Sequence, residues 1–295
     1  MKLLVFISLL ISQLVLPAQH PMDSDRVALY RKIIKTLCAD SMQGRGVSGV
    51  GGKKTAHFIY HEFKSVKHAS TGFQNFKYRV ADTIPADSSQ NVFCFINNHA
   101  DSTVLIGAHY DHIGLGGVLS RSYMKNTVHP GADDNASGVA LMIGLLSNYK
   151  TWSQKKYNYL FVSYSAHEIG LFGSRAFHEY CTKQFKPLCL VINFDMVGRL
   201  DSRQPVLNIY GIQTVSSRRN KIDSLSFPGK VYTNENDKIY ETDAVSYVKS
   251  GIPALSFTTG IHTDYHKVSD TESKINYNGL LIIQKYLEEL LKQTP

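Results

Sequence analysis

The apolar positions along this chain follow two kinds of spacing, which predict the helices and the strands. In residues 23–38 the apolar side chains recur every three or four positions behind an acidic, hydroxyl-containing start, as in a capped amphipathic helix. Residues 53–66 and 277–293 repeat this spacing. The runs at 102–109 and 158–168 are mostly apolar and end in polar residues, which is typical of buried strands.

The remaining segments complete an α/β pattern. A helix is expected at 137–149, and the polar segment 81–90 joins two strands like a hairpin loop. Further strands are expected at 73–80, 91–98, 187–195, 205–211 and 252–260. Because strands and helices alternate, the pattern favours a sheet with helices on both faces. The sequence has no internal repeat and no linker, so residues 19–295 are expected to form a single domain.

Residues 1–18 have the pattern of a secretory signal peptide. Lys2 gives a short positive start, residues 3–16 are apolar, and Pro17 and Ala18 resemble a cleavage region. The apolar run is shorter than the roughly 20 residues that cross a membrane, so no stable membrane span is expected after cleavage. The expected location is secreted or periplasmic, and an uncleaved N-terminal anchor is the alternative.

Charge and cysteine content restrict the function only in part. The net charge of +8 is spread over short basic pieces, so no nucleic-acid partner is expected. Export would permit disulfides, and Cys181 and Cys189 are close enough in sequence to pair, whereas Cys38 and Cys94 are expected to be buried thiols. None of the cysteines has the CxxC spacing of a zinc or redox site.

Chemically active residues collect where the expected strands end. In open α/β sheets, ligands bind at the carboxyl ends of the strands. Four expected strand ends carry imidazoles or carboxylates, at His109, Glu168, Asp195 and His266. A loop that leads into a helix adds a fifth candidate, the pair Asp133 and Asp134. Mixed ligands of this kind suit zinc, whereas calcium prefers oxygen alone. Five ligands are too many for one tetrahedral zinc with an open position, but they suit two zinc ions that share a carboxylate.

The order of these motifs resembles the M28 family of zinc aminopeptidases. The resemblance rests on "GAHYDH", "GADDNASG", "EIGLFGS", "NFDMVGR" and "HTDYHKVSDT", with the earlier "SMQGRGVSG" and the "GIPALSF" strand. It implies a three-layer α/β/α sandwich with a mixed, mostly parallel sheet. It also implies two catalytic zinc ions and the removal of N-terminal residues from peptide substrates that have a free N-terminus.

The resemblance assigns the zinc ligands residue by residue. His109, Asp134 and Asp195 match the ligands of one zinc ion. Asp134, Glu168 and His266 match the ligands of the other, so that Asp134 is expected to bridge the two ions.

Three further residues match positions around the zinc pair. Asp111 matches an aspartate that orients the first histidine ligand and raises its basicity. Tyr265 stands where some relatives place a phenol that donates to the developing oxyanion, with a packed tyrosine as the alternative. Asp243 is expected either to line the site or to cap the helix that follows it.

The chain departs from the family pattern at His167, where most members have a glutamate that acts as the general base. In one interpretation His167 is the base, since an imidazole accepts protons near neutral pH and two dications would keep it neutral. In a second it is a ligand or orients the substrate. In a third the protein binds metal and peptide ends without hydrolysing them. A glutaminyl cyclase, an acyltransferase of the same fold that uses one zinc, is the remaining alternative.

Overall fold

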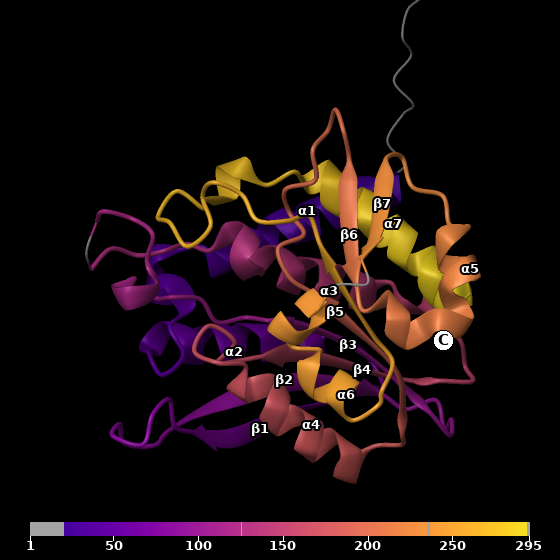
Figure 1. The fold of residues 1–295 in the computed structure, drawn as a ribbon, viewed down its shortest axis with the longest axis horizontal. Coiled ribbons are helices and arrows are strands. Elements are labelled where there is room, and N and C mark those ends of the chain that lie inside the picture. The colour runs from indigo at the N-terminus through magenta and orange to yellow at the C-terminus, as the bar shows by residue number, and fades with distance from the viewer. Residues whose placement is uncertain (1–20, 125, 235–236, 294–295) are drawn as a thin grey trace, which may run out of the picture.

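The computed structural model of the chain describes residues 21–124, 126–234 and 237–293 (Figure 1). The signal peptide expected at residues 1–18 lies outside the described residues. Within these ranges, eight strands form one sheet in the order β1-β2-β4-β3-β5-β8-β6-β7. The strands are β1 (Ser70–Tyr78), β2 (Asp87–Ile96), β3 (Thr103–His109), β4 (Asn158–Tyr164), β5 (Leu188–Phe194), β6 (Val206–Tyr210), β7 (Lys230–Asn234) and β8 (Ala254–Thr258). The central strands β4, β3, β5 and β8 run parallel to one another. The pairs β1–β2, β2–β4 and β6–β8 are antiparallel, and β7 is parallel to β6.

Helices cover both faces of the sheet, which confirms the expected three-layer α/β/α architecture. One apolar core lies between the sheet and α1 (Pro21–Leu37), α2 (Val50–Lys64), α3 (Gly138–Ser147), α5 (Arg219–Asp223) and α7 (Tyr277–Gln293). A second core lies on the other face, against α4 (Phe172–Gln184) and α6 (Val245–Lys249). Figure 1 shows α4 and α6 in front of the sheet, on the opposite side from α1 and α7.

The central strands account for the mostly apolar runs of the sequence. Every residue of β3 and β4 is buried, because each strand has a neighbour on both sides and helices cover both faces. At the edge of the sheet, β1 alternates buried and exposed positions over residues 74–78. Because β3, β4 and β5 are parallel neighbours, their carboxyl ends meet at one edge of the sheet. The loops that leave this edge carry the candidate site.

Most of the expected strands and helices are present, and the differences have physical reasons. β4 ends at Tyr164 rather than at Glu168, because the chain turns at Ala166, which has a φ of 60°. Sequence periodicity does not indicate α4, because Phe177 is the one large side chain among its buried residues, which are Gly173, Ser174, Phe177 and Cys181. It also does not indicate β7, a five-residue strand at the edge of the sheet.

The four cysteines are free thiols. The suggested pairing of Cys181 with Cys189 is wrong, because the two side chains pack into cores on opposite faces of the sheet. Cys94 is buried in β2 as expected, whereas Cys38 follows α1 and is half-buried. Among the helices of the described ranges, none is both long and apolar enough to cross a membrane.

Candidate metal centre

The five expected ligands come from separate segments that converge at the carboxyl edge of the sheet. His109 is the last residue of β3 and Asp195 follows the last residue of β5, so two adjacent parallel strands bring them together. Glu168 lies between β4 and α4, Asp134 lies in the irregular turn before α3, and His266 lies between β8 and α7. The expectation that His266 marks a strand end is wrong, since β8 ends well before it.

The ligand atoms form two groups that share Asp134. His109 Nε2 lies 3.6 Å from Asp134 Oδ1 and 3.5 Å from Asp195 Oδ1. His266 Nε2 lies 3.3 Å from Asp134 Oδ2 and 3.1 Å from Glu168 Oε2. Asp134 therefore faces His109 with Oδ1 and His266 with Oδ2, an arrangement compatible with a bridging ligand.

The chemistry of these atoms fits a pair of metal ions. His109 Nε2, His266 Nε2 and Asp134 Oδ2 are buried and have no hydrogen-bond partner among the described residues. Zinc bonds to nitrogen and oxygen measure about 2.0–2.2 Å, so adjacent ligands of a tetrahedral zinc lie roughly 3.3 Å apart. The contacts of 3.1 to 3.6 Å between the ligand atoms lie around that value. The spacing of these atoms is therefore compatible with zinc ligation.

The carboxylates give the site a negative potential. Burial would lower the pKa of both histidines, but the neighbouring carboxylates outweigh it and raise the pKa of His109 to about 9 and that of His266 to about 10. Burial would raise the pKa of Glu168, but hydrogen bonds from adjacent histidines hold it well below its usual range. A site that binds protons this strongly also attracts metal cations, which compete with protons for the same atoms.

A buried arginine holds the loop of Asp134 in place. Arg45 ends a short 3-10 segment (Asp40–Arg45) and is completely buried. Its guanidinium donates hydrogen bonds to five main-chain carbonyls, those of Leu37, Tyr110, Pro130, Gly131 and Asp134. Arg45 therefore ties the ligand loop to the ends of α1 and β3 through charge-assisted hydrogen bonds.

Gly131 and Asp133 also shape this loop. Gly131 has a φ of 55°, and a Cβ at this position would collide with the carbonyl oxygen of Asp134 and with the ring of His112. Asp133 is directed elsewhere, because its Oδ2 lies 3.2 Å from His262 Nε2. Of the two adjacent aspartates, Asp134 alone joins the ligand group.

Asp111 supports the ligand group through both its main chain and its side chain. His109 Nδ1 lies 3.2 Å from the carbonyl oxygen of Asp111, whereas the nearest Asp111 carboxylate oxygen is 3.9 Å away. The carboxylate accepts hydrogen bonds from the N–H groups of His167 and Glu168, at 3.1 and 3.2 Å. The carbonyl thus orients the histidine ring, and the carboxylate fixes the turn that carries the glutamate.

His167 lies beside the ligand group with its ring stacked on that of His109. The two imidazoles are parallel to within 5°, with centroids 3.7 Å apart. His167 Nδ1 lies 3.0 Å from Asp243 Oδ2, and Nε2 lies 3.9 Å from Asp195 Oδ2. Burial would lower the pKa of His167, but the Asp243, Asp195 and Glu168 carboxylates raise it well above its usual range.

His112 has no role in the sequence-based expectations, yet it lies inside the ligand group. Its ring is buried, and Nδ1 lies 2.8 Å from Glu168 Oε1 and 3.6 Å from Asp134 Oδ2. His112 can donate a hydrogen bond to Glu168 or offer a further nitrogen to a metal ion. The signal is in the motif "GAHYDH", where two histidines and an aspartate fall within four positions at the end of a buried strand.

Tyr265 packs against the second histidine. Its ring stacks on that of His266 with centroids 3.9 Å apart, and the guanidinium of Arg121 lies 4.7 Å from the centre of the Tyr265 ring. Burial raises the pKa of the Tyr265 phenol and nearby carboxylates raise it further, so the hydroxyl stays protonated and able to donate.

A cavity of about 360 Å³ opens beside the ligand group. Asp134, His167, Asp195 and Tyr265 line it on the side of the expected ligands. The remaining lining is largely polar and includes Asn208, Tyr210, Lys238, Glu241, Ser256 and Thr258. A cavity of this size next to the ligand group can receive an amino-acid side chain.

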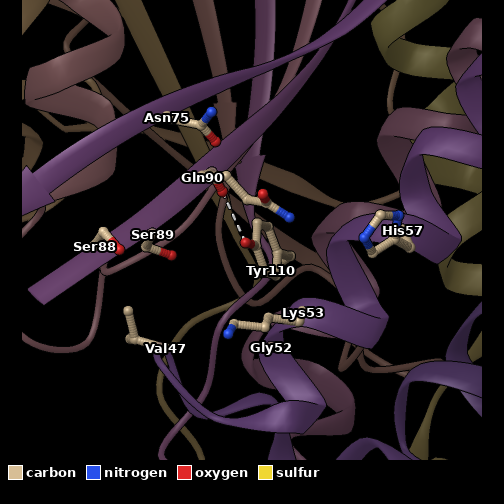
Figure 2. Close-up of a pocket in the computed structure, with 9 residues that line it drawn as sticks. All are labelled: Val47, Gly52, Lys53, His57, Asn75, Ser88, Ser89, Gln90 and Tyr110. Atoms are coloured by element: carbon tan, nitrogen blue, oxygen red, sulfur yellow. Dashed lines mark hydrogen bonds between the residues drawn. The ribbon is translucent and has the colours of Figure 1, made fainter.

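A second cavity, of about 180 Å³, is separate from the ligand group (Figure 2). Lys53 and His57 line it from α2, and Gln90 lines it from β2. The hydroxyl of Tyr110 donates a hydrogen bond to the carbonyl of Gln90 across this cavity, as the dashed line in Figure 2 marks. None of the five expected ligands lines it.

Comparison with known proteins agrees with the motif pattern. A family model described as "Peptidase family M28" matches residues 91–291. Leucine aminopeptidase 1 of Pyrenophora tritici-repentis is 28% identical over 203 residues, which are 63% of this chain and 50% of that protein. The chain thus spans about half the length of this relative.

Solved structures share the fold at low sequence identity. A leucine aminopeptidase precursor from Bacteroides thetaiotaomicron has a TM-score of 0.72 at 14% identity, with 91% of this chain and 97% of that chain covered. A glutaminyl cyclase from Fimbriiglobus ruber has a TM-score of 0.71 at 18% identity, with 94% and 97% covered. Because both kinds of enzyme have this fold, the fold does not choose between their activities.

Proposed function

This chain belongs to peptidase family M28, and from that premise we propose that it is a metallo-aminopeptidase that uses two zinc ions. In this proposal it removes N-terminal residues from peptides with a free N-terminus. The observation that carries the proposal is the position of Asp134, whose two carboxylate oxygens face His109 and His266 separately. A site for one ion would not need a carboxylate shared in this way.

The proposed ligands divide into two sets. His109, Asp134 and Asp195 would hold one zinc ion, and Asp134, Glu168 and His266 would hold the other. Zinc in such a pair supplies Lewis acidity toward the scissile carbonyl and toward the attacking water. The chain itself supplies the orientation of the ligands, through Arg45 and Asp111, and the groups that move protons.

His167 is the proposed general base. The nitrogens of His109 and His167 and an oxygen of Asp195 lie within 4.8 Å of one another, so a shared ion must be considered. A metal ion binds a histidine nitrogen about 2 Å away, in the plane of the ring. Parallel rings with centroids 3.7 Å apart have no common plane, so an ion bound to His109 cannot also bind His167 well. His167 Nε2 is therefore left to exchange protons with water and the leaving amine.

Tyr265 is proposed to assist catalysis by donating a hydrogen bond from its phenol to the substrate carbonyl. Its protonated phenol lines the same cavity as His167, so a substrate carbonyl placed there would lie within its reach. Hydrogen-bond donors that face a developing oxyanion stabilise the transition state. The same cavity would hold the side chain of the N-terminal residue.

The His167 assignment is tested with zinc-loaded wild type, His167→Ala and His167→Glu on aminoacyl p-nitroanilides. We expect the alanine variant to lose about 10²–10⁴-fold in kcat, the usual contribution of a general base, and the glutamate variant to remain active. If the alanine variant is as fast as wild type, His167 is not the base. If wild type is inert and the glutamate variant gains activity, the chain is a member that binds without hydrolysing.

Export is a separate part of the proposal. It rests on the pattern of residues 1–18, which predicts a signal peptide. N-terminal sequencing of the mature protein from its native host tests it: a start near residue 19 supports export, and an intact Met1 contradicts signal cleavage.

A further inference from the structure

We infer that Asp243 is a positioning residue that holds His167 in one tautomer and one orientation, with Nδ1–H donated to Asp243 and the lone pair of Nε2 directed into the cavity. This inference rests on the proposed function. Asp243 lies just before α6, 76 residues from His167 along the chain, and the fold brings the two side chains together.

The contact between the two residues is close and buried. Asp243 Oδ2 lies 3.0 Å from His167 Nδ1, and Asp243 is 1% exposed. Its other oxygen, Oδ1, has no hydrogen-bond partner among the described residues. A buried carboxylate is costly unless a donor or a cation compensates it. The imidazole of His167 is the compensating group that the described residues provide.

Helix capping does not account for Asp243. The N-cap position of α6 is Ala244, and no side chain caps the helix there. Thr242 provides the local turn instead, because its hydroxyl accepts a hydrogen bond from the Ala244 N–H at 3.3 Å. The expected alternative, in which Asp243 is a helix cap, is therefore wrong, and its side chain is available to His167.

Two other contacts hold His167 in place, one through its ring and one through its main chain. Its face stacks on His109, and its main-chain N–H donates to Asp111 Oδ1 at 3.1 Å. With Nδ1 engaged by Asp243, the ring atom left for proton exchange is Nε2, on a side chain that is 16% exposed and lines the cavity. Orientation of an imidazole base by a buried aspartate is the same physical arrangement that serves hydrolytic triads.

The tautomer is measured directly by long-range ¹H–¹⁵N NMR of the zinc-loaded protein with ¹⁵N-labelled histidine, with His167→Gln used to assign the signals. The inference expects Nδ1 to be protonated and Nε2 to carry the lone pair. In Asp243→Asn, whose amide can donate to Nδ1, we expect the opposite tautomer or a mixture. A wild-type ring protonated only at Nε2, or an unchanged spectrum in Asp243→Asn, overturns the inference. This result does not depend on peptidase activity.

A double-mutant cycle separates positioning from a general structural role. In the wild-type background, Asp243→Asn should lower kcat by at least about 10²-fold while KM changes little, since an incorrect tautomer removes the base. In the His167→Glu background the same substitution should be neutral or beneficial, because Asp243 would then face a carboxylate. Equal losses in both backgrounds would show a structural role. Asp101→Asn, at an exposed position, is the matched control and should leave kcat unchanged.

Discussion

Arg45 offers a direct test of how the ligand loop is held. Arg45→Lys keeps the positive charge but replaces a planar fork of five N–H donors with an ammonium that has three. An ammonium can serve at most three of the five carbonyls, and the Gly131 carbonyl also accepts from the Ala136 N–H, so at least one carbonyl would lose its donor. Each unsatisfied buried acceptor costs about 1–3 kcal/mol, so the free energy of unfolding should fall by at least about 1–3 kcal/mol.

Urea unfolding of wild type and Arg45→Lys measures this loss as a lower midpoint at unchanged slope. Arg203→Lys, at an exposed position, is the matched control and should remain within about 0.5 kcal/mol of wild type. Zinc affinity should also fall in Arg45→Lys, because two of the carbonyls belong to the loop of Asp134. An Arg45→Lys variant that unfolds at the same urea concentration as wild type and binds zinc equally well would show that Arg45 does not hold the loop.

Three further predictions concern other residues. His112→Gln should weaken zinc binding by about 10–100-fold in calorimetry, because losing a group that orients the metal ligands, or that is itself a ligand, usually costs this much affinity. An unchanged affinity would contradict a role for His112 at Glu168. Tyr265→Phe should lower kcat more than it changes KM if the phenol donates to the transition state, whereas a proportional rise in KM alone would indicate packing or uniform binding. Burial raises the pKa of the Cys94 thiol to about 11 and that of Cys181 to about 12. Because the unfolded thiols ionise at lower pH than the folded ones, these groups leave stability unchanged below about pH 8.5 and reduce it progressively above that value. Both thiols should resist alkylation in the native protein and react in urea, and rapid native alkylation would contradict their burial.

The sequence predicts the fold well where one periodicity dominates. β3, β4 and β5 are buried on both faces, so their apolar runs stand out, and the α/β/α sandwich follows from the alternation of these strands with helices. α4 escapes the pattern, because small residues form part of its buried face. The end of β4 is also not predicted, because the left-handed backbone conformation of Ala166 cannot be inferred from the pattern of apolar residues.

The candidate site can be predicted from the sequence only in part. His109 and Asp195 stand at strand ends and are found by position alone, whereas Glu168 and His266 lie in loops and depend on the order of the motifs. Contacts made across the fold leave no local signal. His167 and Asp243 are 76 positions apart in the chain, and sequence spacing does not predict contacts between residues so far apart.

The failed pairing of Cys181 with Cys189 illustrates the limit of sequence distance. The two cysteines are near neighbours along the chain, but α4 and β5 place them on opposite faces of the sheet. Closeness in sequence therefore gave the wrong answer here, because the direction in which each element presents its side chains decides the contact.

Mass spectrometry of a peptide library incubated with the zinc-loaded protein tests the proposed aminopeptidase activity most directly. We expect products shorter by one N-terminal residue, with no shortening of peptides whose N-terminus is acetylated and none in the presence of a chelator. Loss of ammonia from peptides that begin with glutamine, without shortening, would indicate a glutaminyl cyclase instead. A library that remains unchanged would contradict the proposed aminopeptidase.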